Sequence, residues 1–454
     1  MASNHDHDDV DSWLHGRIDP LSPPPGTFEA IKRRARRRKL RKVVVSAGAA
    51  AAIIAAVVAV PRVINLQVEP ARQMAGATPA TATVNTTGGP GRVEAPTATP
   101  APLPSGNPVP PNFQPTSITA VSAQTMFVIG QAGTPGHCAT QYCTSVARTQ
   151  DDGGTWEGLP APLTGAPDGA TGVGQIRFLD GINGWAFGPE LWATHDGGEK
   201  WTPIGTHGQR VIDVETVGNR AFAIEATCTG TGPDYATQCV DFTLYSTPAT
   251  ADDWTPLGKT TTNLTGTDGW GSAALVLTGT KGYLLAPDGI LYDGSVTATQ
   301  PWKASGKVPC AVGLSQPDGA PAWAVLGALT PEHLILDCTQ SGWIYRSSDS
   351  GASWQQAISV PNTNGPAGAV TITTSIAASP AASVILGTDK GIEVLPAGGT
   401  WRAAMLNGTA PDKGFSFVGM TTWTSGIALP ADATAETVWF TTDGGLTWTP
   451  SQVQ

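Results

Sequence analysis

Short apolar stretches separated by Gly, Pro and Asp turns extend from about residue 116 to the end of the chain. The strongest of these stretches are Met126–Gly130, Gly184–Gly188, Ala221–Ile224, Gly282–Leu285, Ala322–Gly327, Val384–Gly387 and Gly426–Leu429. Runs of this length are typical of β-strands, and no helical period occurs after residue 65. The pattern predicts an all-β domain over residues 116–454.

A turn motif follows these stretches, with the pattern [Ser/Thr]-x-Asp-x-Gly-x-x-Trp. Complete copies are Thr149, Asp151, Gly153 and Trp156; Thr194, Asp196, Gly198 and Trp201; Ser347, Asp349, Gly351 and Trp354; and Thr441, Asp443, Gly445 and Trp448. The Asp accepts backbone N–H bonds in a tight turn, and the Gly supplies a positive φ. The Trp begins the next strand and buries apolar surface against the turn. We interpret these residues as structural.

Weaker copies of the motif fill the gaps and end at Trp254, Trp302 and Trp401. The seven motif tryptophans, from Trp156 to Trp448, follow one another at intervals of 45 to 53 residues. This period is typical of four short strands, which form one blade of a β-propeller. We therefore predict a seven-bladed β-propeller of four-stranded antiparallel blades over residues 116–454.

Three segments precede the predicted propeller. Residues 1–42 are a polar tail that ends in the basic run Lys32–Lys42, and Val43–Val60 is apolar and uncharged. As a helix the apolar run spans about 27 Å, close to the thickness of a membrane core. We predict a transmembrane signal anchor at residues 43–65 with a cytosolic tail; a cleaved signal peptide is the alternative. Residues 66–115, rich in Pro, Thr and Ala, predict a disordered stalk.

Charge separates the tail from the rest of the chain. Residues 1–42 contain ten basic and six acidic residues, a net charge of +4, which leaves a net charge of −14 for residues 43–454. An acidic domain argues against nucleic acid as a partner. All six cysteines lie after residue 130. An even number in one part of the chain predicts disulfides in an oxidising, extracytoplasmic compartment.

The turn motifs resemble the Asp-box, or BNR, repeat of sialidases, sortilin-type receptors and related propellers. In the second blade, Asn183–Gly188 followed by Leu191–Trp201 resembles propellers of the photosystem II assembly factor type. The order of basic tail, anchor, stalk and propeller is similar to that of actinobacterial membrane proteins of unassigned role. The resemblance implies the fold but no particular function, since Asp boxes lie on turns away from the usual ligand face.

The resemblance to sialidases raises the hypothesis of a glycoside hydrolase. Sialidases bind the substrate carboxylate with three arginines and open their first blade with an Arg-Ile-Pro motif. The nearest match here is Ile176–Phe178 in the second blade, which lacks the proline. Glu332, His333 and Asp337 are interpreted as a polar loop of the fifth blade. Since neither metal-ligand spacing nor a phosphate loop occurs, we predict no metal and no cofactor.

The cysteines indicate where a ligand face lies. The predicted disulfides are Cys138–Cys143 in the first blade, Cys228–Cys239 in the third and Cys310–Cys338 in the fifth, although other pairings stay open. All six cysteines fall either in connections between second and third strands or in connections between blades. In a meandering blade both kinds of connection emerge on the face opposite the Asp boxes. Long braced loops on one rim are typical binding sites, while simple bracing is the alternative.

Three aromatic residues are candidates for a ligand rim on this face, with core packing as the alternative: Tyr235, Trp270 and Trp343. The whole pattern predicts a single-pass membrane protein whose extracytoplasmic propeller binds a protein or glycan without catalysis. Two alternatives stay open: a transmembrane sensor whose cytosolic tail engages a regulator, and a sialidase-like hydrolase.

Overall fold

The computed structural model describes residues 106–454 apart from residues 135–136, 139–143, 166, 168–169, 231–238, 261–272, 311–323, 339–341, 361–372, 378–381, 397–398, 423 and 433. The predicted tail and anchor, and the stalk up to residue 105, lie outside the described residues. A search of the described part of the chain finds no helix with the length and apolar character needed to cross a membrane.

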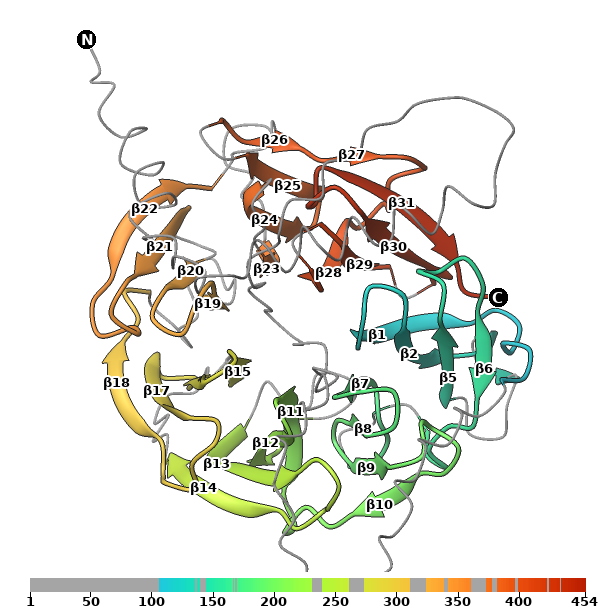
Figure 1. The fold of residues 1–454 in the computed structure, drawn as a ribbon, viewed down its shortest axis with the longest axis horizontal. Coiled ribbons are helices and arrows are strands. Elements are labelled where there is room, and N and C mark those ends of the chain that lie inside the picture. Colours follow the sequence, from blue (N-terminus) through green and yellow to red (C-terminus); the bar gives the residue numbers. More distant parts are fainter. Residues whose placement is uncertain are drawn as a thin grey trace, which may run out of the picture. The chain divides into compact units, whose positions relative to one another are not determined.

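Seven sheets form a ring, each built from strands that are consecutive in the sequence (Figure 1). Blade 1 contains β1 (Gln114–Ala120), β2 (Met126–Gln131), β5 (Thr144–Thr149) and β6 (Glu157–Leu159). Blade 2 contains β7 (Gln175–Phe178), β8 (Gly184–Phe187), β9 (Leu191–Thr194) and β10 (Thr202–Ile204). Blade 3 contains β11 (Arg210–Val217), β12 (Arg220–Cys228), β13 (Cys239–Pro248) and β14 (Thr255–Thr260). The short β3 (Gly133–Thr134) and β4 (His137–Cys138) pair with each other between β2 and β5.

The remaining blades continue the same order. Blade 4 contains β15 (Ala274–Leu277), β16 (Lys281–Leu285), β17 (Ile290–Ser295) and β18 (Lys303–Lys307). Blade 5 contains β19 (Ala324–Ala328), β20 (Leu334–Cys338), β21 (Trp343–Ser347) and β22 (Gln355–Ser359). Blade 6 contains β23 (Thr373–Ala377), β24 (Ala382–Thr388), β25 (Gly391–Pro396) and β26 (Arg402–Ala403). Blade 7 contains β28 (Phe415–Met420), β29 (Gly426–Pro430), β30 (Thr437–Thr441) and β31 (Thr447–Gln452).

The prediction of an all-β, seven-bladed propeller is confirmed. Six blades have four antiparallel strands, and blade 7 has a fifth, because β27 (Met405–Leu406) pairs in parallel with β31. Burial decreases from the centre outwards. The five apolar residues Met126–Gly130 are fully buried in β2, because neighbouring blades cover both faces of an inner strand. The outermost strand β22 is polar and largely exposed. This gradient explains why the inner strands read as continuous apolar runs.

The predicted start of the propeller at residue 116 is too late. Asn107 and Gly158 of β6 exchange two backbone hydrogen bonds of 2.8 and 2.5 Å. Phe113 is 1% exposed and belongs to the apolar cluster shared by blades 1 and 7. Residues 107–115 therefore belong with the propeller, because this segment covers the outer edge of blade 1 before it enters the core. Its Pro-rich composition concealed that role.

The motif tryptophans pack across the seams between blades. The indole N–H of Trp156 donates to Ser451 Oγ of blade 7 (3.0 Å), and that of Trp201 donates to the Pro160 carbonyl after blade 1 (2.9 Å). The Trp401 indole donates to the Ser359 carbonyl of blade 5 (2.8 Å). These three indoles therefore hydrogen-bond outside their own turns, whereas the Trp448 indole donates to the carbonyl of its own box residue Gly445 at 2.8 Å.

The apolar core is divided among these seams. Separate clusters lie between blades 7 and 1, 1 and 2, 2 and 3, and 3 and 4, and a larger one joins blades 4 to 7. Each cluster contains a motif tryptophan or has one packed against it. Trp254, for example, meets Trp185 of blade 2 edge to face at a centroid distance of 6.3 Å. Apolar contacts that join neighbouring blades are therefore distributed around the ring.

We expect Trp156→Phe to lower the free energy of unfolding by about 1 kcal/mol more than Trp254→Phe. Both side chains are buried to the same degree, at 9% and 8% exposed, and both substitutions remove similar area. Only Trp156 loses a hydrogen bond, because the Trp254 indole N–H has no partner among the described residues. Urea unfolding of the full-length protein, followed by circular dichroism, measures the difference; equal losses would contradict the seam role of Trp156.

Candidate binding face

The two faces of the ring carry different connections. In a meandering antiparallel blade, the turns between strands one and two and between strands three and four lie on one face. This face carries all the Asp boxes and is called the box face. Connections between strands two and three, and from blade to blade, lie on the other, called the rim face. The longest connections between described strands start and end on the rim face; they join β6 to β7, β14 to β15, β18 to β19 and β22 to β23.

The four complete Asp boxes share one hydrogen-bond pattern. The Ser or Thr hydroxyl at the first position donates to Asp Oδ1 at 2.7–2.9 Å and accepts the N–H of the box glycine at 2.8–3.0 Å. The same Asp oxygen accepts the backbone N–H of the residue before the tryptophan at 2.8–3.0 Å. Sequence analysis assigned no part to the hydroxyl, which proves to link the Asp to the glycine.

These hydrogen bonds lower the pKa of three box acids, Asp151, Asp349 and Asp443. Bonds from Thr155 hold the pKa of Asp151 below its usual range, and bonds from Ser353 and Ser347 lower the pKa of Asp349 to about 2. In Asp443, bonds from Thr447 lower the pKa although burial opposes them. A carboxylate whose oxygens are occupied by its own turn is a poor general acid. The boxes therefore have a structural role.

Two disulfides brace the rim face, at the pairs that the sequence predicts. Cys228–Cys239 joins the facing ends of β12 and β13, and Cys310–Cys338 ties the connection before blade 5 to the end of β20. Of the third predicted pair, Cys138–Cys143, Cys138 ends the described strand β4 and Cys143 lies outside the described residues, so this pair stays a prediction. Disulfides persist in oxidising compartments, so the propeller is extracytoplasmic.

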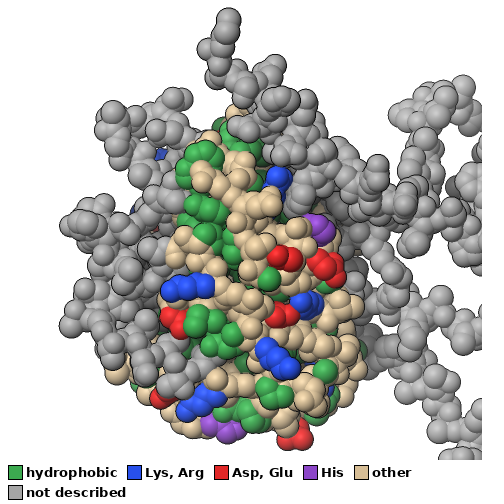
Figure 2. Space-filling view, turned by 90° about the vertical axis from the view of Figure 1, so that its left-hand side faces the viewer, with side chains coloured by type: hydrophobic (Ala, Val, Ile, Leu, Met, Phe, Trp, Pro, Cys, Tyr) green, Lys and Arg blue, Asp and Glu red, His purple; other side chains and the backbone are tan. Residues whose placement is uncertain are grey.

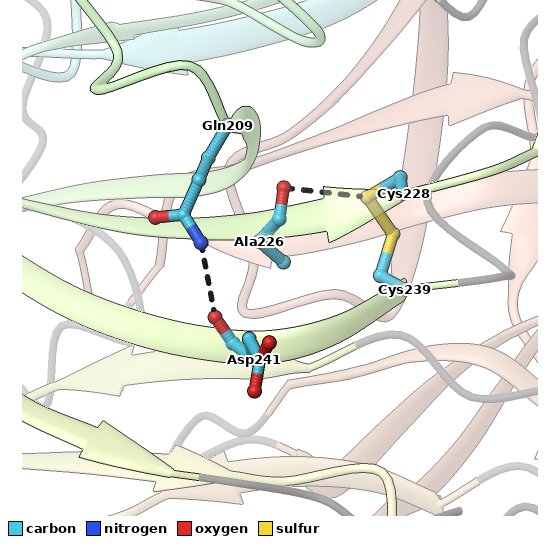
Figure 3. Close-up of a disulfide and its surroundings, with 5 residues drawn as sticks. All are labelled: Gln209, Ala226, Cys228, Cys239 and Asp241. Carbon is cyan, nitrogen blue, oxygen red and sulfur yellow. Dashed lines mark hydrogen bonds between the residues drawn. A yellow bond between two sulfur atoms is a disulfide. The ribbon is translucent and has the colours of Figure 1, made fainter.

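The rim of blade 3 is bound to the connection before it (Figure 3). Gln209 Nε2 donates to the Asp241 carbonyl at 3.1 Å. Asp241 has a φ of 57° at a bulge, where the register of β12 and β13 shifts. A bulge turns the strand locally and re-aims its side chains. Beside it, Val240 is 42% exposed, so the braced edge presents an apolar side chain to solvent.

A second contact on blade 3 joins His207, Glu225 and Tyr245. His207 Nδ1 lies 3.1 Å from Glu225 Oε2, and the imidazole stacks on the Tyr245 ring at 4.6 Å with an interplanar angle of 3°. Burial raises the pKa of Glu225 and, with the Glu225 charge, that of Tyr245. Sequence analysis missed this group. No local signal marks it, because the three residues come from different elements and meet only through strand register.

Charged side chains also join the innermost strands of blades 2 to 4. Arg177 Nε of β7 donates to Glu215 Oε1 of β11 at 2.9 Å, and Asp213 Oδ2 accepts the Leu275 N–H of β15 at 3.0 Å. Burial raises the pKa of Glu215 to about 8, because it outweighs the lowering effect of the Arg177 charge. The nearby Asp213 charge also raises this pKa. Ile176–Phe178, the nearest match to the sialidase motif, therefore holds blades together.

Of the predicted rim aromatics, Tyr235 and Trp270 lie outside the described residues. Trp343 begins β21 opposite Cys338 and is 38% exposed on the rim face. The interpretation of Glu332, His333 and Asp337 as one loop is wrong for Asp337, which is fully buried in β20 because that position faces the core. Within the described ranges, no three His, Cys, Asp or Glu side chains are placed to hold a metal ion.

Comparison with known proteins gives structural similarities alone. No family model and no curated protein matches the sequence. The propeller is similar to YCF48 bound to D1 peptide, with 15% identity and a TM-score of 0.43 over 76% of this chain and 97% of that one. YCF48 from Cyanidioschyzon merolae has 13% identity and a TM-score of 0.45, over 75% of this chain and 96% of that one. A GH74 enzyme from Niastella koreensis has 13% identity and a TM-score of 0.29, over 75% and 66%. At these values none of the similarities bears on function.

Replacing both cysteines of either disulfide with serine should destabilise the propeller. The chain-entropy model gives about 3 kcal/mol for a loop near 15 residues and more for longer loops. The Cys310–Cys338 pair, 28 residues apart, should therefore cost more than the Cys228–Cys239 pair, 11 apart. Thermal unfolding of both double variants beside the parent protein measures the order; the reverse order would show that strain or local packing dominates.

The buried acid Glu215 should make stability fall as the pH rises. Its pKa is about 8 in the folded chain against 4.5 for an ordinary glutamate, so folding takes up a proton. The stabilisation is complete below pH 4.5 and is lost as the pH rises through about 8. Urea unfolding from pH 5 to 8 should give a flatter profile for Glu215→Gln than for the parent protein. Glu157→Gln, whose parent carboxyl has a lowered pKa, is the control and should keep the parental slope.

Proposed function

We propose that this chain is a membrane-anchored propeller that binds a protein partner through its rim face, without catalysis. The distribution of exposed apolar side chains carries the proposal. Among the described residues the large exposed ones are Leu163 (67%), Val240 (42%), Trp343 (38%) and Met405 (65%). The first three belong to rim-face connections or to strand ends beside them. The fourth, Met405, lies on the outer edge of blade 7, where its N–H donates to the Leu446 carbonyl of the box at 2.9 Å. Three of the four exposed apolar side chains therefore lie on the rim side.

The disulfides support this assignment. Val240 follows Cys239, and Trp343 pairs across the strands with Cys338, so two of the exposed side chains are held beside covalent links. Side chains fixed in position lose little entropy when a partner binds. Tryptophan is also prominent among the residues that dominate binding energy. An exposed tryptophan on a braced strand end therefore supports a protein interface.

The outer edge of the ring differs in character. Seen from the side of β18 and β22, it carries Lys, Arg, Asp and Glu interspersed with one another, with groups of hydrophobic side chains between them (Figure 2). Interspersed charges of both signs are typical of a solvated surface.

Two arginines of the propeller, Arg148 and Arg177, favour binding over hydrolysis. Arg148 Nε donates to Glu157 at 2.6 Å, and Arg177 Nε donates to Glu215 at 2.9 Å. Arginines engaged by internal acidic side chains are unavailable for a substrate carboxylate. In the proposal, residues 1–42 remain a cytosolic tail, residues 43–65 an anchor, and residues 66 to about 105 a stalk that separates the propeller from the membrane. The two disulfides support the extracytoplasmic side for the propeller.

We expect Trp343→Ser to weaken capture of the partner at least tenfold, about 1.4 kcal/mol, because an anchoring aromatic side chain is lost. Met405→Ser is the matched control, since Met405 is exposed on the outer edge of blade 7. Detergent-solubilised full-length protein and its variants would be used to capture proteins from extracts of surface and secreted material, with quantification by mass spectrometry. Equal loss in both variants would contradict a rim interface, as would turnover of fluorogenic glycosides that Trp343→Ser abolishes.

A further inference from the structure

A solvent-open cavity of about 480 Å³ lies where the first and last blades meet. The Asp box of blade 1 and the box and outer strand of blade 7 form its walls. Its size is within the range of small-ligand sites. The cavity is on the box face, so it is separate from the proposed rim interface.

The lining is acidic. It includes Asp151, Asp152 and Asp443, together with Asn407, several hydroxyls and the ring of Phe440. Asp151 and Asp443 are ionised, because hydrogen bonds from their own turns hold their pKa values low. Their oxygens serve these turns, so they contribute negative potential rather than contacts. The cavity is therefore favourable for a positively charged group.

Asp152 differs from the other two acids. Its carboxyl has no hydrogen bond or ion pair among the described residues, although its backbone N–H donates to the Gln124 carbonyl. Burial and the Asp151 charge raise its pKa. A partly desolvated carboxyl beside a second negative charge is stabilised when a cation binds. Among the residues that the structure describes, none forms an ion pair with this carboxyl.

The turn does not require an acid here. The corresponding residues of the other complete boxes are Gly197, Ser350 and Gly444, all with positive φ between 62° and 81°. Asp152 takes up the same left-handed conformation with a φ of 59°. Glycine is the residue that this conformation favours. An aspartate at this point adds a carboxyl that the fold does not use, directly at the cavity.

The remaining lining favours a planar cation. Asn407 Nδ2 donates to Thr449 Oγ1 at 3.2 Å, which leaves its amide oxygen to accept a hydrogen bond. Phe440 is 8% exposed and packs on Gly153 and Trp156, so only a small part of its ring borders the cavity. A guanidinium has five donors and weakly hydrated faces that stack on aromatic rings, whereas an ammonium is a compact, strongly hydrated charge. We propose that this cavity binds an arginine side chain of a peptide.

The test uses purified full-length protein and two probes of nearly equal shape, N-acetyl-arginine methylamide and its neutral citrulline counterpart. Calorimetric titration at neutral pH should show saturable binding of the arginine probe and at least tenfold weaker binding of the citrulline probe. Asp152→Asn should weaken arginine binding at least tenfold. Asp253→Asn, the same charge change at an exposed position of blade 3, should leave it unchanged. Each variant is first checked for an unchanged Tm.

The pH dependence adds a second readout. Arginine binding should weaken as the pH falls through the raised pKa of Asp152, because protonation removes the charge, and Asp152→Asn should abolish this dependence. Four results would overturn the proposal: absence of arginine binding, equal binding of citrulline, unchanged binding by Asp152→Asn, or an equal loss in Asp253→Asn. Displacement of the arginine probe by millimolar calcium at constant ionic strength would also overturn it, by assigning the cavity to a metal ion.

Discussion

The packing of box tryptophans across blade seams is the interaction on which the ring depends. Each described blade is built from its own consecutive strands, so the first and last blades share none. Side chains alone therefore close the ring. Trp156 donates to Ser451 Oγ, which in turn donates to the Gly153 carbonyl at 2.5 Å, and the Phe440 ring packs against both Trp156 and Gly153. At other seams Trp201 and Trp401 donate to carbonyls of the preceding blade, whereas Trp254 and Trp302 pack against aromatic rings of the preceding blade with no indole hydrogen bond among the described residues.

The two faces of the ring therefore have different roles: the box face is structural, and the rim face carries the long connections. On the box face, the Asp carboxylate, the Ser or Thr hydroxyl and the Gly N–H of each complete box form hydrogen bonds with one another. Such turns tolerate little change. Loop connections such as those of the rim face tolerate changes of length and composition from blade to blade. Disulfides then supply the rigidity that packing provides elsewhere.

Parts of the candidate site were visible in the sequence because they are local. The cysteine pairs could be predicted from their place between strands, and Trp343 from its position beside Cys338. The contact between His207, Glu225 and Tyr245 could not be predicted, since a bulge in β12 and β13 changes which side chains meet. Residues 107–115 were also misassigned, because a Pro-rich segment that pairs at a blade edge has the composition of a linker.

The sequence alone determined the number of blades and the chemistry of the turns. Strand length, turn residues and the tryptophan interval are local properties, and each blade repeats them independently. Only the tertiary structure decided which residues meet across the seams. Asp152 and Phe440 line one cavity although they are separated by most of the propeller. Their proximity depends on the accumulated rotation of seven blades, which closes the ring through long-range contacts that no local pattern encodes.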